Sequence, residues 1–375
     1  MRSFHMRSFA FISLALTLGI VQTATAQPVN TMTRNLYLGA NLTPAIVAPT
    51  LPALVAATGK ILRDVTHNDF PTRAEGLAQE ILEKKPDLIG LQEVALWRTA
   101  AVNFAVLVTG PSATDVRYDY LEDLLGHLNQ RKQEYEVVVV QEEFDFEAPA
   151  DEDGDPTTGG FLGADINGRL TMRDVILARS KAYVRTWNEQ GGHFTNLLPV
   201  DILGTQVPVV RGWTATDAWV RGSEPFRFVN THLEAFHPVV RAQQAGELVE
   251  AGGPAASDDL PVILVGDLNS DDDTVTFPDT LAYNLLLDAG MVPISTDEPL
   301  SCCLNSSLLG EGDGGDITDF DHQVDHIMTR NPHNVLLRHS EVTGLEPVNG
   351  FWNSDHAGVF SALMLRRVSP LEVQP

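Results

Sequence analysis

Short apolar runs alternate along the chain with segments of helical periodicity. The runs are rich in valine, isoleucine and leucine and end in polar residues, as strands buried on both faces do. Between them lie segments with apolar residues on one face that close on proline or glycine, which predicts amphipathic helices. The strands are predicted at 87–94, 134–141, 169–179, 226–234, 261–269, 324–330 and 356–365, and the helices at 73–86, 239–253 and 279–290.

Strands interleaved with helices imply a layered α/β protein. The sequence shows neither an internal repeat nor a long linker, so we expect one catalytic domain over residues 27–375. The polar stretch 148–160 predicts a solvated loop. A calcium-binding loop is the alternative there, but Pro156 and Leu162 occupy the positions where an EF-hand has glycine and glutamate.

The N-terminal residues 1–26 have the pattern of a secretory signal peptide. Arg2 and Arg7 precede an apolar run at 9–21, and small residues follow it at 24–26. The run is shorter than the roughly 20 residues that span a bilayer. An interfacial anchor helix is the alternative. We therefore expect a secreted or periplasmic protein without a stable membrane span.

The composition is strongly acidic and poor in cysteine. The 375 residues include 50 Asp and Glu against 25 Lys and Arg, which gives a net charge of −25. Such a charge repels polyanions at long range and disfavours tight non-specific nucleic-acid binding, although solubility or salt adaptation would produce the same acidity. The two cysteines, Cys302 and Cys303, are adjacent and cannot link distant parts of the fold. We expect them to be a loop pair without a catalytic role.

Polar residues of the kinds that bind metals or move protons stand at the ends of several predicted strands. Ligands gather at strand ends in α/β sheets, so these side chains are expected to converge. Each one alone is better explained as a cap or turn former, but that explanation does not account for all of them together. The residues are Asn35, Glu93, Asn230, His232, Asp267, Asn269, Asp325, Asp355 and His356.

In chain order these residues and their neighbours resemble the endonuclease/exonuclease/phosphatase superfamily. The resemblance is carried by Asn35 and by the motifs LQEV, NTHLEA, GDLNS, VDHI and SDHAG, and it is nearest to the deoxyribonuclease I and sphingomyelinase branches. It implies a four-layer α/β/β/α sandwich, in which two packed, mainly antiparallel sheets are flanked by helices.

The resemblance also implies a metal site and a phosphate contact. Asn35 and Glu93, with Asp355 in or beside the same shell, would hold a divalent metal ion, Mg²⁺ or alternatively Mn²⁺. Arg173 would clamp the substrate phosphate. A salt bridge with a neighbouring acid is an equal alternative for Arg173.

The catalytic roles follow from the same resemblance. His356 would be the general base, with Asp325 fixing its tautomer. His232 would stabilise charge on the transferring phosphoryl group. Asp267 and Asn269 would orient the attacking water and the phosphoryl oxygens.

The function expected from these roles is that of a secreted, divalent-metal-dependent phosphodiester hydrolase. Its substrate would be nucleic acid or a phospholipid headgroup. A non-catalytic binding module on the same fold and a phosphomonoesterase remain as alternatives. The apolar segment 193–203 is either a lipid-dipping loop or a buried strand pair.

Overall fold

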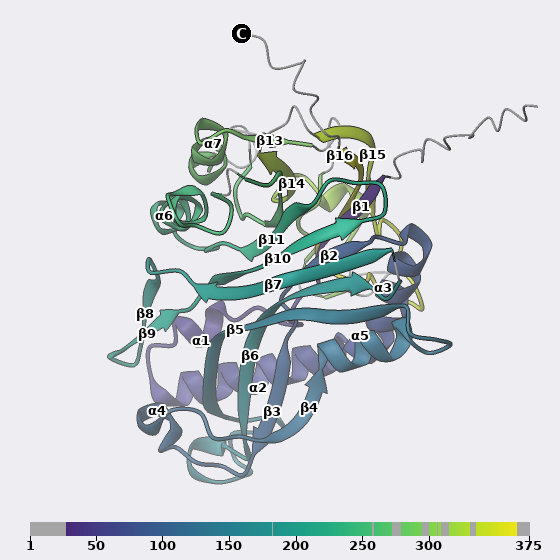
Figure 1. Ribbon diagram of the computed structural model, residues 1–375. Coiled ribbons are helices and arrows are strands. Elements are labelled where there is room, and N and C mark those ends of the chain that lie inside the picture. Colours follow the sequence, from purple (N-terminus) through teal and green to yellow (C-terminus); the bar gives the residue numbers. More distant parts are fainter. Residues whose placement is uncertain are drawn as a thin grey trace, which may run out of the picture.

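The computed structural model describes residues 28–181, 183–256, 259–271, 279–294, 300–305, 307–308, 315–330 and 335–365. The predicted signal peptide, 1–26, lies outside the described residues. Two large mixed sheets pack face to face and carry helices on their outer faces (Figure 1). The expected four-layer α/β/β/α sandwich is confirmed.

In the part of the chain that the structure describes, the first sheet has eight strands, and their pairing is antiparallel except between β1 and β2. Strand β5 pairs along the whole length of β6, outside the main order. In spatial order the strands are β15 (Val335–Thr343), β16 (Gly358–Leu365), β1 (Val29–Asn35), β2 (Leu88–Gln92), β6 (Ile166–Arg179), β3 (Leu96–Ala100) and β4 (Asp115–Asp119), with β5 (Tyr135–Ala150) beside β6.

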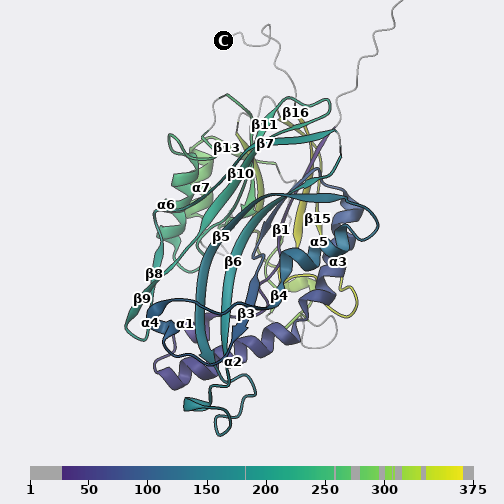
Figure 2. The same ribbon diagram turned by 60° about the horizontal axis from the view of Figure 1, so that its bottom comes forward.

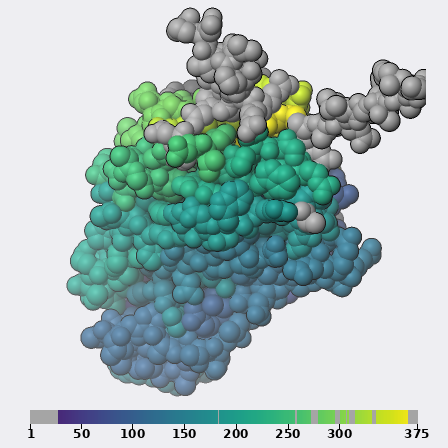
Figure 3. All heavy atoms as spheres, viewed as in Figure 1, coloured from purple at the N-terminus to yellow at the C-terminus, as the bar shows by residue number. Residues whose placement is uncertain are grey.

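Among the described residues, the second sheet has six strands, and β11 and β12 form its parallel pair. Figure 1 shows its strands β7, β10 and β11 lying side by side, and in the same view Figure 3 shows teal atoms across the middle of the visible face. In spatial order they are β13 (Met291–Pro293), β14 (Asp325–Arg330), β12 (Val262–Asp267), β11 (Phe226–His232), β10 (Gly212–Val220) and β7 (Val184–His193).

A separate hairpin joins β8 (Leu198–Ile202) to β9 (Thr205–Val209). Ile202 is buried in a cluster with Ala48 and Leu54, so this end of the hairpin packs onto the body of the protein. Segment 193–203 therefore contains one strand of a hairpin, but most residues of the two strands are exposed or half-buried, unlike the buried strand pair that was expected.

The helices divide between the two outer faces. Figure 2 shows α6 and α7 on the opposite side of the molecule from α3 and α5. No helix in the described part of the chain is long and apolar enough to cross a membrane. The helices are α1 (Thr43–Ile46), α2 (Leu51–His67), α3 (Phe70–Lys84), α4 (Val106–Thr109), α5 (Tyr120–Leu128), α6 (Pro238–Val249) and α7 (Leu281–Asp288), with 3₁₀ turns at Phe161–Gly163 and Ile317–Asp319.

Three apolar layers hold the sandwich together, one between the sheets and one under each set of helices. Between the sheets, Leu88 and Ile176 of the first sheet share a fully buried cluster with Phe228 and Ile263 of the second. Successive side chains of a strand point to opposite faces, so a strand with both faces covered reads as a continuous apolar run. This is why the buried strands could be predicted from the sequence.

Helix α2 was not predicted, and one glycine contributes to the reason. A Cβ placed on Gly59 would lie 1.7 Å from the carbonyl oxygen of Asp151, so glycine permits the helix to approach the end of β5. A glycine inside a helix lowers its intrinsic propensity by about 1 kcal/mol relative to alanine. Strand β5 also continues to Ala150, so the polar loop begins later than expected.

Candidate active site

The pairing of the strands brings the predicted residues to one edge of the sandwich. Strands β1 and β2 run parallel and end together, with Asn35 opposite Gln92. Strands β11 and β12 do the same in the second sheet, with His232 opposite Asp267. Strand β14 runs the other way and starts at this edge, so that Asp325 lies opposite Asp267. Within each sheet, the register therefore gathers residues that are far apart in the sequence, and the packing of the two sheets brings both groups together.

Asp267 is the central acceptor of the site. Its Oδ2 lies 3.0 Å from Asn35 Nδ2 and 3.4 Å from His232 Nε2. The same oxygen lies 3.8 Å from His356 Nε2, while Oδ1 accepts the backbone N–H of Asn269 at 2.9 Å. Burial raises the pKa of Asp267 to about 6, against the lowering effect of His356. Both sheets thus aim polar groups at one carboxylate.

His356 is held by a second carboxylate. Its Nδ1 lies 2.8 Å from Asp325 Oδ2, an oxygen that also accepts the Ser301 hydroxyl at 2.7 Å. Burial alone would lower the pKa of His356, but Asp325 and Asp267 more than offset it, so the pKa stands well above its ordinary value. The contact orients the ring so that Nε2 faces Asp267, as expected for an Asp-His pair.

Two carboxylates of the predicted metal set, Glu93 and Asp355, line a cleft beside these residues. Glu93 follows β2 directly, and its Oε2 accepts the N–H of Leu38 at 2.7 Å. Burial, together with the charge of Glu93, raises the pKa of Asp355 to about 7. Asn35 Oδ1 accepts the N–H of Tyr37 at 2.9 Å and keeps a second lone pair. Hard oxygen donors and mutually repelling acids at one place fit a divalent cation such as Mg²⁺ or Mn²⁺.

Backbone strain accompanies the site. Three non-glycine residues here have left-handed backbones: Tyr37 (φ 57°), Glu93 (φ 53°) and Asn269 (φ 48°). Asn269 is held in this conformation by its Nδ2, which donates to the carbonyl of Leu233 at 3.0 Å. Such conformations cost of order 1–3 kcal/mol each and cluster where a side chain must be aimed.

His232 has a cation as its second partner. The ring is buried, and its Nδ1 lies 2.9 Å from Nη1 of Arg211. Burial and the charge of Arg211 hold the pKa of His232 well below its ordinary range. Arg211 stands immediately before β10 and lines the cleft. It was not predicted from the sequence, because no motif surrounds it.

Arg173 forms a salt bridge, and it is not among the described residues that line this cleft. Its Nη2 lies 2.6 Å from Asp119 Oδ1, and its Nε donates to the carbonyl of Val94 at 2.8 Å. Asp119 also caps α5 by accepting the N–H of Leu121 at 3.1 Å. The salt-bridge alternative is therefore the arrangement observed, and Arg173 fastens α5 to the first sheet.

The cleft has a volume of about 190 Å³ and is lined by both polar and apolar residues. Its polar groups are those of Tyr37, Glu93, Arg211 and Asp355, with Asn41 and Thr43 at the side. Phe236, which is 55% exposed, stands among the apolar residues of the wall. The other apolar lining residues are Leu38, Ala40, Leu42, Ile46, Phe144, Met172, Val209 and Ala235.

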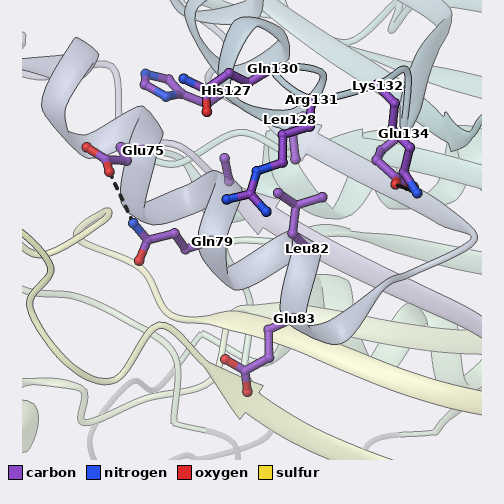
Figure 4. Close-up of a pocket in the computed structure, with 11 residues that line it drawn as sticks. Glu75, Gln79, Leu82, Glu83, His127, Leu128, Gln130, Arg131, Lys132 and Glu134 are labelled. Carbon is purple, nitrogen blue, oxygen red and sulfur yellow. Dashed lines mark hydrogen bonds and ion pairs between the residues drawn. The ribbon is translucent and has the colours of Figure 1, made fainter.

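A larger hollow of about 770 Å³ lies between α3 and α5 (Figure 4). Its walls carry both acids and bases, and Gln79 donates to Glu75 across one turn of α3. None of the residues expected to be catalytic lines it. Volume alone therefore does not identify the site, and the convergence of buried polar groups does.

Sequence reasoning also missed two buried acids and the position of the cysteines. Glu143 of β5 and Asp174 of β6 are both buried close enough to Arg211 to interact with its charge. The sulfurs of Cys302 and Cys303, joined as a disulfide, lie 3.6 and 3.7 Å from His356 Nε2. The cysteine pair thus touches the site, although no role was expected for it.

Comparison with known proteins finds a family model and solved structures that are similar to this chain. A model described as "Endonuclease/Exonuclease/phosphatase family" matches residues 61–356. No curated protein matches the chain. Among solved structures, an endonuclease/exonuclease/phosphatase family protein from Bacteroides thetaiotaomicron is similar, with a TM-score of 0.52, 15% identity and coverage of 90% of this chain and 96% of that one. The mannosyl-6-phosphatase Bt3783 from the same organism has a TM-score of 0.50, 15% identity and coverage of 90% and 100%.

Proposed function

Because the chain belongs to the endonuclease/exonuclease/phosphatase family, we propose that it is a divalent-metal-dependent phosphodiester hydrolase. The observation that carries the proposal is the convergence of His232, His356 and Asn35 on one buried oxygen of Asp267. These polar side chains come from both sheets, and the acid Asp355 lies close enough to interact with His356, Asp267 and Glu93. Such a set suits the chemistry of a phosphate ester.

Each group has a task in hydrolysis. A divalent cation held by Asn35, Glu93 and Asp355 would supply Lewis acidity toward a phosphoryl oxygen. Asp267 and Asn269 orient the water that attacks in line with the departing oxygen. His356, fixed by Asp325, moves the proton through Nε2.

The proposed substrate is a diester that carries fewer negative charges than a nucleic acid. A phospholipid headgroup therefore suits this cleft better than a polyanion does. Arg211 is the single basic residue among the described residues that line the cleft, and the chain carries a net charge of −25. The exposed ring of Phe236 and the side chains of Leu42 and Ile46 give the mouth an apolar wall. Nucleic acid and a phosphomonoester are the competing substrates.

A panel of esters tests both the reaction and the substrate. With Mg²⁺ present, the protein should hydrolyse bis-p-nitrophenyl phosphate and a vesicle phospholipid such as phosphatidylcholine or sphingomyelin. Turnover of plasmid DNA, RNA and mannose 6-phosphate should be slower. Phe236→Ser should depress turnover on vesicles and spare the soluble diester. Faster cleavage of DNA or of the monoester would replace the lipid assignment.

We also propose that the enzyme acts outside the cytoplasm, on the basis of the pattern in residues 1–26. N-terminal sequencing of the protein secreted by an expressing bacterium tests this. A mature chain beginning near Gln27 in the periplasm or medium is expected. A cytoplasmic protein that retains Met1 would contradict it.

A further inference from the structure

The two histidines of the site face one carboxylate but have opposite partners on their other nitrogen. His356 Nδ1 lies 2.8 Å from the carboxylate of Asp325, whereas His232 Nδ1 lies 2.9 Å from the guanidinium of Arg211. A carboxylate accepts hydrogen bonds, and a guanidinium can only donate them. The partners therefore impose different protonation patterns on the two rings.

The contact with Arg211 permits only one tautomer of a neutral His232 ring. A guanidinium stays protonated in proteins and offers no lone pair. Its Nη1–H can approach Nδ1 of His232 only when that nitrogen is unprotonated. The single proton of the neutral ring then sits on Nε2, which lies 3.4 Å from Asp267 Oδ2 at the face of the site. His232 is thereby a neutral donor aimed at the centre.

Two buried acids lie near Arg211. Glu143 is 6% and Asp174 is 0% exposed, and both carboxyl groups interact with the charge of Arg211. Glu143 Oε1 would lie 3.3 Å from a Cβ placed on Gly212, next to Arg211 in the chain. Buried charges persist only when they are balanced. Arg211 supplies a positive charge near both acids: burial raises the pKa of each carboxyl group, and the charge of Arg211 opposes that rise.

We propose that Arg211 is a positioning residue that keeps His232 neutral, with its proton on Nε2, so that this ring donates a hydrogen bond at the reacting centre while His356 moves the proton. The assignment of roles at the centre rests on the proposed function. The tautomer itself does not, because it follows from the contact between Arg211 and His232.

The tautomer can be measured in the wild-type protein. ¹⁵N-histidine labelling and a multiple-bond ¹H–¹⁵N spectrum distinguish a protonated from an unprotonated ring nitrogen. The spectrum of His232→Asn identifies the signals of this residue among the 11 histidines of the chain. We expect an unprotonated Nδ1 and a protonated Nε2 at neutral pH. A protonated Nδ1 on His232 would overturn the proposal.

Variants at position 211 test the cause. Arg211→Met removes the donor and should let His232 populate the other tautomer or bind a second proton. Arg211→Lys keeps a charged donor and should restore the wild-type spectrum in part. On the soluble diester, Arg211→Met should lower kcat by about tenfold to a hundredfold with a smaller change in KM, because a donor aimed at the transition state is lost.

Arg227→Met is the matched control. Arg227 is a partly buried arginine that pairs with Asp217 at 2.7 Å, away from the cleft, so its loss should leave the His232 spectrum and kcat unchanged. An Arg211→Met protein with the wild-type His232 tautomer would refute the positioning role. A chain inactive on every ester would remove the proposed function but would leave the tautomer measurement standing. If Arg211→Met does not fold, the wild-type spectrum and Arg211→Lys decide.

Discussion

Asp325 Oδ2 and His356 Nδ1 lie 2.8 Å apart although they come from different sheets. Asp325 opens β14 of the second sheet, and His356 stands two residues before β16 of the first. Neither residue could meet the other without the face-to-face packing of the sheets. The pair therefore links the fold to the chemistry, because the packing of two apolar faces sets the geometry of the proton-moving group.

Glu93 should control the response to metal ion. Glu93→Gln removes a charged oxygen donor from the cleft, so the Mg²⁺ concentration for half-maximal turnover should rise at least tenfold. The thermal midpoint should change little. A metal titration of diester hydrolysis measures the effect, and the exposed Glu122→Gln is its control. Full activity of the wild type in excess chelator would rule out the metal requirement.

Asp87 should make stability depend on pH. This buried carboxyl accepts the N–H of Asn30 at 3.0 Å, and burial raises its pKa from 3.8 to about 6. A raised folded pKa contributes stability that is full below the unfolded pKa and is lost as pH rises through 6. Ionised Asp87 thus costs the folded state up to about 3 kcal/mol at pH 8.

Asp87→Asn removes that titration and retains an acceptor for Asn30. Its advantage in free energy of unfolding over the wild type should grow by about 1 kcal/mol between pH 5 and pH 8. Denaturant unfolding at the two pH values measures it. An advantage that is the same at both pH values would show that burial of this charge does not limit stability. The exposed Asp115→Asn should show no such trend.

Asn230 should stabilise the contact between the sheets. It lies in β11 of the second sheet, accepts from Gln92 Nε2 at 2.6 Å and donates to the carbonyls of Leu91 and Val175 in the first. Asn230→Ala would leave several of these buried groups unpaired, at about 1–3 kcal/mol each. We expect unfolding to become easier by about 2–5 kcal/mol.

Denaturant unfolding tests this effect. The exposed Gln206→Ala, changed in the same way, should shift the free energy of unfolding by less than about 0.5 kcal/mol. A similarly small shift for Asn230→Ala would mean that the apolar layer alone holds the sheets together.

The polar residues at the ends of strands could be predicted from the sequence. The residues that contact them from neighbouring strands could not. His232, Asp267 and Asp325 were predictable because each stands at the end of an apolar run, where local pattern and position coincide. Arg211 and Glu143 reach the site through the register of β10 and β5, and neither residue has a local pattern that indicates it. Their contact with the site depends on the packing of both sheets.

The position of Arg173 in β6 could have been interpreted from the alternation of side chains between the two faces of a strand. It shares a face of β6 with Val175 and Leu177, which pack in the cluster under α3 and α5. Asp174 shares the opposite face with Ile176, which lies between the sheets. Because a period of two separates these faces, the acid and not the arginine was placed to approach the site.

The rate of bis-p-nitrophenyl phosphate hydrolysis by His356→Ala, in Mg²⁺, tests the central claim most directly. Loss of the proton-moving group should lower kcat by about a hundredfold to ten-thousandfold, with the circular dichroism and unfolding midpoint close to those of the wild type. The exposed His339→Ala, on the neighbouring strand β15, should keep the wild-type rate. A folded His356→Ala protein that turns over the diester at the wild-type rate would contradict the account.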